Sequence, residues 1–299
     1  MKILLTGGSG QLGKSIIKLK PLNVDLIAPD RSKLDLAKTE SCIKFVKEEK
    51  PDWIINCGAF TNVDKAESEK DNVFRVNYEA PKNFSKVLSD YGGKLLHISS
   101  DYVFDGYKNK PYLTNDKVNP QNIYGYSKAL AEQSIKEILL EKNSYLILRT
   151  SWVLSPNGNN FLLTMINLMN RDNDIRVVND QVGSMTSTNN LANSCWQLIS
   201  ANEEYSLKDL TFPPIQHWCD DGIISWYQLA KEIRKIIQVS GLIENPAEII
   251  PISSNDYKFI AKRPKYSVLS CTETEKLIKI KRIYWKTSLY NILNVILAK

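Results

Sequence analysis

Histidine is almost absent from this sequence of 299 residues, which contains only His97 and His217. Any mechanism that needs a cluster of histidines is therefore excluded, and His97, which lies inside an apolar run, is interpreted as a core residue. The five cysteines are scattered, and no two of them have CxxC spacing. A sparse, odd set of cysteines argues against a disulfide scaffold and predicts buried thiols in a reducing compartment.

Long apolar runs and a strong charge excess are also missing. No uninterrupted apolar stretch approaches the roughly 18 residues that a membrane span needs, and the short apolar run after Met1 and Lys2 leads straight into glycines, unlike a signal peptide. A net charge of +6 is too small to indicate nucleic-acid binding. With 43% hydrophobic residues the chain can form a large core. We therefore expect a cytoplasmic globular protein without a membrane or nucleic-acid partner.

Short apolar runs alternate with helical patterns in the first half of the chain. The runs are apolar almost throughout and predict strands buried on both faces, at 2–6, 24–28, 53–56, 94–98 and 145–148. The patterns between them predict helices over 11–20, 39–50 and 72–91. This alternation predicts an α/β fold with a doubly wound parallel sheet of the Rossmann type.

The second half is less regular. Its apolar spacing predicts helices over 160–171, 188–201, 225–239 and 287–298. We expect a first domain over 1–155 and a smaller C-terminal α/β part over 156–299, some segments of which return to the first sheet.

A glycine-rich turn, TGGSGQLG, follows the first predicted strand and opens the first helix. In this position Gly7 permits a tight turn, Gly10 lets the backbone approach a pyrophosphate, and Gly13 allows the helix to pack closely on the strand. The turn therefore predicts that residues 1–155 bind a dinucleotide.

The end of the second strand bears on the choice of cofactor. Asp30 lies about 20 residues after the glycine turn, where a carboxylate would accept hydrogen bonds from the adenosine ribose. Arg31 follows it, and a guanidinium could instead hold a 2′-phosphate. The residues leave NADH and NADPH both open.

A tyrosine and a lysine lie four residues apart at the start of a further helical pattern. Tyr124 and Lys128 share one helix face, and we expect the ammonium to lower the pKa of the phenol. Tyr124 could then exchange a proton with a carbonyl or alcohol oxygen. Ser100 and Asp101 close the fourth strand at the sheet edge where open α/β folds bind ligands, so the serine hydroxyl can bond to the same oxygen.

These motifs resemble those of the extended short-chain dehydrogenase/reductase superfamily and, within it, the dTDP-4-dehydrorhamnose reductase family. The segments that carry the resemblance, in the family's order, are TGGSGQLG (6–13), NCGAFTNVDKAE (56–67), SSDYVFDG (99–106), NIYGYSK (122–128), RTSWV (149–153), GNNF (158–161), NDQVGS (179–184) and KRPKYSVL (262–269). The resemblance implies a Rossmann domain that holds NADPH or NADH, and a C-terminal part that holds a nucleotide sugar.

The motifs and the resemblance together assign roles to single residues. The catalytic set would be Ser100, Tyr124 and Lys128. The cofactor would contact Gly7, Gly10, Gln11, Leu12, Gly13, Asp30, Arg31, Asp35, Leu36, Gly58, Ala59, Phe60, Tyr124 and Lys128. The nucleotide sugar would contact Ser100, Asp101, Trp152, Asn160 and Arg263, the last of these at its diphosphate.

Three features refine this assignment. Met185 stands where the family has a proline, in the loop near the sugar. Lys14-Ser15 replaces a glutamate that helps some members to bind Mg²⁺, so we expect no metal site. Residues 258–286 hold nine Lys and Arg against two Glu. This local excess surrounds Arg263 and predicts that the segment attracts an anionic nucleotide sugar.

The strand-end sequence also bears on the reaction. Ser100-Asp101-Tyr102 lacks the glutamate with which related dehydratases remove a proton, so elimination is disfavoured. The resemblance implies one hydride transfer to a 4-keto sugar, converting dTDP-4-dehydro-L-rhamnose to dTDP-L-rhamnose and supplying rhamnose for cell-surface polysaccharide, by a monomer or a homodimer. Two alternatives remain: reduction of another nucleotide-linked 4-keto sugar, and a non-catalytic nucleotide-binding regulatory subunit.

Overall fold

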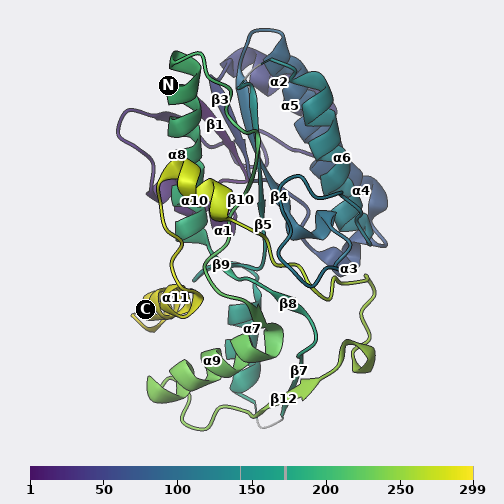
Figure 1. Ribbon diagram of the computed structural model, residues 1–299, viewed down its shortest axis with the longest axis vertical. Coiled ribbons are helices and arrows are strands. Elements are labelled where there is room, and N and C mark those ends of the chain that lie inside the picture. The colour runs from purple at the N-terminus through teal and green to yellow at the C-terminus, as the bar shows by residue number, and fades with distance from the viewer. Residues whose placement is uncertain (142, 172–173, 299) are drawn as a thin grey trace.

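The computed structural model describes residues 1–141, 143–171 and 174–298, and a parallel sheet runs through its first half (Figure 1). Within the described residues the sheet has six strands in the order β10-β5-β4-β3-β1-β2. In chain order these are β1 (Lys2–Thr6), β2 (Asp25–Ile27), β3 (Trp53–Asn56), β4 (Lys94–Ser100), β5 (Tyr145–Thr150) and β10 (Ile215–His217). Every neighbouring pair is parallel, which confirms the doubly wound α/β prediction.

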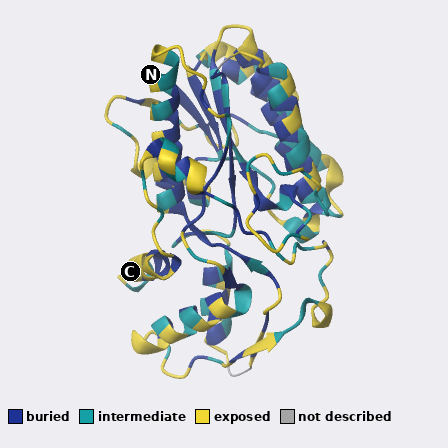
Figure 2. Cartoon of the chain, in the orientation of Figure 1, coloured by how far each residue is buried: buried dark blue, intermediate teal, exposed yellow. Residues whose placement is uncertain are grey.

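Helices cover both faces of this sheet (Figures 1 and 2). Successive strand residues point to opposite faces, so Leu5 packs into a core cluster with the helices of one face and Leu4 into a second cluster on the other. The first face carries α1 (Gln11–Lys18), α8 (Thr188–Leu207) and α10 (Thr272–Ile278); the second carries α2 (Thr39–Glu49), α5 (Ala80–Ser89) and α6 (Ile123–Ile138). The strands read as continuous apolar runs because both of their faces are buried.

The chain between β3 and β4 departs from the single helix expected over 72–91. It forms α3 (Val63–Ala66), α4 (Lys70–Phe74), a π-helical segment (Arg75–Glu79) and then α5. Pro81 stands in the first turn of α5 and has no backbone N–H to continue the α-helical bonding pattern through that turn. The π-helical segment turns the buried side chain of Asn77 toward the loop that follows β3.

The second half builds a smaller lobe below the sheet in Figure 1. Its core joins the apolar faces of three helices: α7 (Phe161–Met169), α9 (Trp226–Val239) and α11 (Trp285–Leu297). Short strand pairs complete it: β6 (Val153–Leu154) with β9 (Thr186–Ser187), β7 (Ile175–Val178) with β12 (Ile249–Ile252), and β8 (Val182–Gly183) with β11 (Ile224–Ser225). Between these segments the chain returns to the large sheet, where β10 pairs with β5 and α8 packs on α1.

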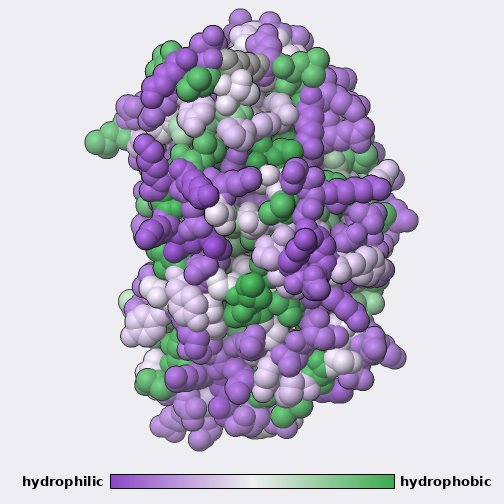
Figure 3. Space-filling model, in the orientation of Figure 1, coloured by the Kyte–Doolittle hydropathy of each residue, from purple (hydrophilic) through white to green (hydrophobic). Residues whose placement is uncertain are grey.

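Helix boundaries differ from the predicted ones by a few residues. The helix expected over 188–201 continues to Leu207 as α8, whereas those expected over 11–20 and 160–171 end at Lys18 and Met169. None of the described helices is long and apolar enough to cross a lipid bilayer. Polar residues cover most of the face in Figure 3, with small separate apolar patches between them.

Candidate functional site

The glycine turn between β1 and α1 has the geometry of a phosphate cradle. Gly7 has a φ of +69°, and a Cβ there would lie 2.7 Å from the backbone nitrogen of Gly58. A Cβ on Gly13 would lie 2.2 Å from the carbonyl oxygen of Gly7, so α1 can approach the turn only because Gly13 has no side chain. Gly10 is the N-cap of α1, and no side chain among the described residues caps the first turn. The free N–H groups and the positive end of the helix dipole suit a dinucleotide pyrophosphate.

The loop after β2 holds the residues predicted to select the cofactor. Asp30 Oδ1 accepts hydrogen bonds from the backbone and hydroxyl of Ser32 and from the backbone of Lys33, and these bonds lower the pKa of the exposed carboxyl. Arg31 Nε lies 3.5 Å from Asp35 Oδ1, and its side chain is 79% exposed. The structure therefore presents both the carboxylate and the guanidinium at the surface.

The loop after β3 is held by a residue that the sequence reasoning missed. Asn77 accepts a hydrogen bond from the backbone N–H of Phe60 at 2.8 Å and donates to the Phe60 carbonyl at 3.1 Å. The same amide donates to Ser127 Oγ on α6 at 3.0 Å. One buried side chain thus ties the loop of Gly58, Ala59 and Phe60 to the helix that carries Tyr124. The only available signal was an asparagine in a helical stretch that contains a proline.

The end of β4 and the start of α6 bring Ser100, Asp101 and Tyr124 together. Ser100 is the last residue of β4, and its hydroxyl donates to Asp101 Oδ1 at 2.9 Å and accepts from the backbone of Tyr102 at 3.2 Å. Asn122 caps α6 by accepting from the backbone of Gly125, which places Tyr124 in the first turn. A hydrogen bond links Tyr124 to Ser100, and its ring meets Tyr102 edge-on with centroids 5.6 Å apart.

The electrostatics of this cluster correct one expectation. Burial raises the pKa of Tyr124 to about 12, although its hydrogen bond with Ser100 opposes the rise. Lys128 is not among the groups that lower it. The Lys128 amine is engaged with β4 instead: Nζ donates to the Ile98 carbonyl at 2.6 Å and lies 3.1 Å from His97 Nε2. Burial lowers the pKa of Lys128 to about 8 and raises that of Asp101 to about 6. The expected lowering of the Tyr124 pKa is therefore wrong for the protein without its ligands.

The predicted sugar contacts Trp152 and Asn160 are bound to other protein groups. Trp152 adopts a φ of +44°, rare for a side chain of this size, and its ring stacks on Trp226 at 3.6 Å between centroids. Asn160 caps α7 and donates to Gln11 Oε1 at 2.8 Å. Gln11 in turn donates to the carbonyl of Asn159 at 3.1 Å. Gln11 thereby joins the glycine turn to the small lobe, and the role of Asn160 toward a sugar stays a prediction.

Arg263 reaches the same region from the C-terminal part of the chain. Its Nη2 pairs with Asp64 at 2.7 Å, and its guanidinium lies 4.6 Å from the centroid of the Phe259 ring. Nη1 is buried and makes no hydrogen bond within the described residues. Arg263, Asp101 and Tyr124 lie close enough to Tyr102 to influence the pKa of its phenol. The four side chains therefore belong to one cluster. Part of the positive charge of residues 258–286 is neutralised by the protein itself, because Arg282 forms ion pairs with Asp221 and Glu275.

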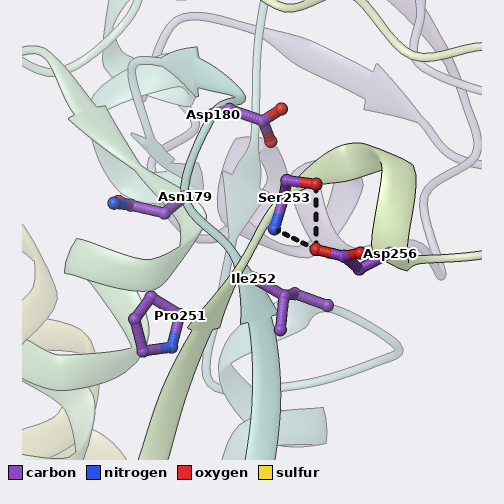
Figure 4. Close-up of a pocket in the computed structure, with 6 residues that line it drawn as sticks. All are labelled: Asn179, Asp180, Pro251, Ile252, Ser253 and Asp256. Carbon is purple, nitrogen blue, oxygen red and sulfur yellow. Dashed lines mark hydrogen bonds between the residues drawn. The ribbon is translucent and has the colours of Figure 1, made fainter.

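A surface hollow lies apart from these residues. It measures about 370 Å³ and is lined by Asn179, Asp180, Pro251, Ile252, Ser253 and Asp256 in the small lobe (Figure 4). Its carboxylates are satisfied internally: Asp180 accepts from Ser254, and Asp256 accepts from Ser253. None of the predicted site residues lines it, and we assign it no role.

The fold and the site together define a class. A Rossmann sheet, an uncapped glycine turn, and a serine, tyrosine and lysine at the ends of β4 and α6 are the features of an extended short-chain dehydrogenase/reductase. The family model described as the RmlD substrate binding domain matches residues 1–297. The chain therefore belongs to the RmlD family of NAD(P)-dependent nucleotide-sugar reductases, which confirms the predicted family.

Individual relatives agree over almost the whole chain. A dTDP-4-dehydrorhamnose reductase of Aggregatibacter actinomycetemcomitans is 34% identical over 293 residues, which is 97% of this chain and 98% of the relative. The spore coat polysaccharide biosynthesis protein SpsK of Bacillus subtilis is 35% identical over 289 residues, 96% of this chain and 95% of that protein. The crystal structure of a dTDP-4-dehydrorhamnose reductase from Bacillus anthracis in complex with NADP is 32% identical, covers 98% of this chain and 99% of its own, and superposes with a TM-score of 0.87.

Proposed function

We propose that this protein reduces the 4-keto group of dTDP-4-dehydro-L-rhamnose to give dTDP-L-rhamnose, with NADPH or NADH as reductant. The observation that carries the proposal is a pair of buried polar atoms beside Tyr102 that make no hydrogen bond within the described residues: the acceptor Asp101 Oδ2 and the donor Arg263 Nη1. Buried polar atoms are normally paired. An acceptor suits a sugar hydroxyl, a guanidinium suits a diphosphate, and the hydroxyls of Ser100 and Tyr124 stand beside them.

The protein groups act on the carbonyl oxygen. Tyr124 donates its proton to the oxygen as negative charge develops, and Ser100 donates a hydrogen bond to the same atom. Without substrate the Ser100 hydroxyl donates to Asp101, so this hydroxyl must turn toward the carbonyl oxygen when the substrate binds. Lys128 directs its amine to the cofactor ribose and, when charged, stabilises the tyrosinate that remains. The reduced nicotinamide, when bound, supplies the hydride.

The cofactor fits the first half of the site. The uncapped first turn of α1 would hold the pyrophosphate, and the loop of Gly58 to Phe60 would lie along the dinucleotide. Arg31 is supported as a contact for a 2′-phosphate by its exposed guanidinium and by the NADP-bound relative. We therefore favour NADPH over NADH, and we propose that the protein acts in the cytoplasm.

A second candidate is the reduction of a different nucleotide-linked 4-keto sugar. It is favoured by a relative from Streptomyces niveus that is named a dTDP-4-keto-6-deoxy-D-glucose reductase and is 30% identical over 267 residues. The two candidates share every chemical step and differ in the sugar hydroxyls that face Asp101 and Trp152.

One assay separates these possibilities. Purified protein is mixed with NADPH or NADH and with a panel of dTDP-, UDP- and GDP-linked 4-keto-6-deoxy sugars, and the absorbance of the reduced cofactor is followed. The proposal requires the highest kcat/KM with dTDP-4-dehydro-L-rhamnose. A higher value with another sugar supports the second candidate. No oxidation with any sugar, while the protein binds the cofactor, would instead identify a nucleotide-binding regulator.

A further inference from the structure

Four buried side chains form a continuous hydrogen-bonded row across the middle of the large sheet. Thr6 Oγ1 lies 2.6 Å from Asn56 Oδ1, the Asn56 amide lies 3.0 Å from His97 Nδ1, and His97 Nε2 lies 3.1 Å from Lys128 Nζ. Thr6, Asn56 and His97 are direct neighbours in register on β1, β3 and β4. Each of the four is at most 2% exposed. We call them the polar row.

The polar row connects two parts of the site. At one end Thr6 Oγ1 accepts the backbone N–H of Gly58 at 3.1 Å, in the loop predicted to line the cofactor. At the other end it reaches the Lys128 amine. Buried polar groups are costly unless they are paired, and β-strand cores can be built from apolar residues alone, so a row that ends on two functional elements calls for an explanation beyond packing.

The contacts of Lys128 show what the row does. An ammonium has three N–H donors. The Ile98 carbonyl takes one at 2.6 Å, and His97 Nε2 is placed to take a second at 3.1 Å. Two bonds to one rigid strand stop the ammonium from rotating about its own axis. The third N–H then has a fixed direction, which is the one left for a ligand.

The remaining members set the tautomer of His97. A neutral imidazole has one donor and one acceptor nitrogen, so Nε2 can accept from an ammonium only when Nδ1 carries the hydrogen. In the structure Thr6 Oγ1 donates to Asn56 Oδ1 and the Asn56 NH₂ group faces Nδ1, so Nε2 carries the hydrogen and only an uncharged Lys128 amine can accept it. Pairing with an ammonium requires the Asn56 amide to be turned round, so that its oxygen faces Nδ1 and its NH₂ group donates to Thr6. The row can therefore satisfy both charge states of the lysine.

The imidazole itself stays neutral. Burial and the charge of Lys128 hold the pKa of His97 well below its usual range. The other groups that influence Lys128 are Glu132, one turn further along α6, and the thiol of Cys57 after β3. Lys128 therefore has one neutral hydrogen-bond partner, His97, and two ionisable neighbours, Glu132 and Cys57.

We propose that His97 is a positioning residue for the reduction, which fixes the orientation of the Lys128 amine through Nε2 while Asn56 and Thr6 set its tautomer. This inference rests on the proposed function, because it assigns Lys128 to the cofactor and to Tyr124. It differs from a packing role in that only one of the two ring nitrogens, the one that faces Lys128, matters for catalysis.

Two substitutions separate the two nitrogens. In His97→Asn the side-chain amide can replace Nδ1 and keep the contact with Asn56, but it is too short to reach Lys128. In His97→Gln the amide oxygen can replace Nε2 and keep the contact with Lys128. His217→Gln is the matched control, because His217 is equally buried, lies two strands away in β10, and contacts Arg149 at 3.3 Å instead.

The first measurement is the Kd of NADPH by fluorescence titration, which needs no sugar substrate; the second is kcat with both substrates saturating. We expect His97→Asn to weaken NADPH binding and to lower kcat, each by about tenfold to a hundredfold, because a displaced amine loses its alignment. His97→Gln and His217→Gln should stay within about threefold of the unmodified protein, a difference of under 1 kcal/mol. Equal losses in both His97 variants, with all proteins folded by circular dichroism, would overturn the proposal.

A double substitution tests whether His97 acts through Lys128. In a Lys128→Met background His97→Asn should cause less than a further twofold loss of NADPH affinity, since coupled residues are not additive. A full further loss would show an independent role and overturn the proposal. If the unmodified protein binds NADPH but reduces no keto sugar, the proposed function fails, whereas the affinity measurements still decide the role of His97.

Discussion

Ser100 and Asp101 are joined by a hydrogen bond of 2.9 Å in which the serine hydroxyl donates to Oδ1, while Oδ2 of the same carboxylate is buried without a partner in the described residues. Burial raises the pKa of Asp101 to about 6, although hydrogen bonds with Ser267 and Ser100 oppose the rise. Such a site costs stability in order to keep an acceptor ready for a ligand.

The first prediction follows from that cost. The native protein binds the Asp101 proton more tightly than the unfolded chain, so this contribution to stability is complete below pH 4 and is lost as pH rises through about 6. Asp101→Asn removes the ionisation and should raise the free energy of unfolding at pH 8 by about 1–3 kcal/mol, with no gain at pH 4. Urea denaturation at the two pH values measures this. A gain of the same size at both would contradict the assigned cause.

The second prediction concerns the proton donor. Tyr124→Phe should lower kcat by about 10²–10⁴-fold, because the hydroxyl that protonates the carbonyl oxygen is lost. The Kd of NADPH should change little. Tyr126→Phe is the matched control: Tyr126 lies two residues further along α6, is exposed, and meets Phe74 edge-on. Steady-state kinetics of both variants decide the matter, and a Tyr124→Phe enzyme with normal turnover would require another proton donor.

The pH profile gives a third prediction. Burial lowers the pKa of Lys128 to about 8, although Glu132 opposes this. Below that pH the amine is charged and can stabilise the tyrosinate, so kcat/KM should fall as pH rises through about 8. Lys128→Arg keeps its charge over the whole range, so its residual activity should lack this decline. If the decline persists in the arginine variant, it belongs to another group.

The glycine turn and the sheet could be predicted from the sequence because their causes are local. A glycine with φ near +69° and a run of apolar residues each constrain their own neighbourhood. The break in the helix after β3 was missed, because one helix was expected over 72–91 although Pro81 lies within it. The contacts of Lys128 could not be predicted either, because His97 lies 31 residues away and only strand register brings it there. His97 was predicted to be a core residue, and it is buried, but its polar partners come from other strands.

The Tyr124 expectation was wrong for a related reason. Spacing places Tyr124 and Lys128 on one helix, but it does not reveal that β4 takes two of the lysine's hydrogen bonds or that burial dominates the tyrosine pKa. Asn160 and Gln11 show the same limit: both belong to motifs of the resemblance, and the structure bonds them to each other. A motif therefore locates a site, while the partner of each atom depends on tertiary packing.

The fourth prediction tests the cofactor preference. Arg31→Ala should weaken NADPH binding by about tenfold or more, the loss of one charge-assisted contact, and leave NADH binding unchanged. Lys33→Ala is the control, because Lys33 is an exposed cation in the same loop. Fluorescence titration gives the Kd of NADPH and of NADH for each of the two variants. An equal loss with both cofactors would remove Arg31 from the 2′-phosphate site.

The last prediction concerns the diphosphate. Asp64 and Phe259 hold the Arg263 guanidinium, and Nη1 has no hydrogen-bond partner in the part of the chain that the structure describes, so the contact is prepared before the substrate arrives. Arg263→Met should raise KM for the nucleotide sugar, and the inhibition constant of dTDP, by about tenfold or more, with a smaller change in kcat. Lys262→Met removes the same charge from the neighbouring position, where Nζ bonds to Tyr107 and Gln121. Equal losses in both variants would assign the effect to the field of the basic segment rather than to a direct contact. A loss of affinity in Arg263→Met alone, which Arg263→Lys restores only in part, would support a bidentate contact. A guanidinium can form such a contact with the diphosphate, and an ammonium cannot.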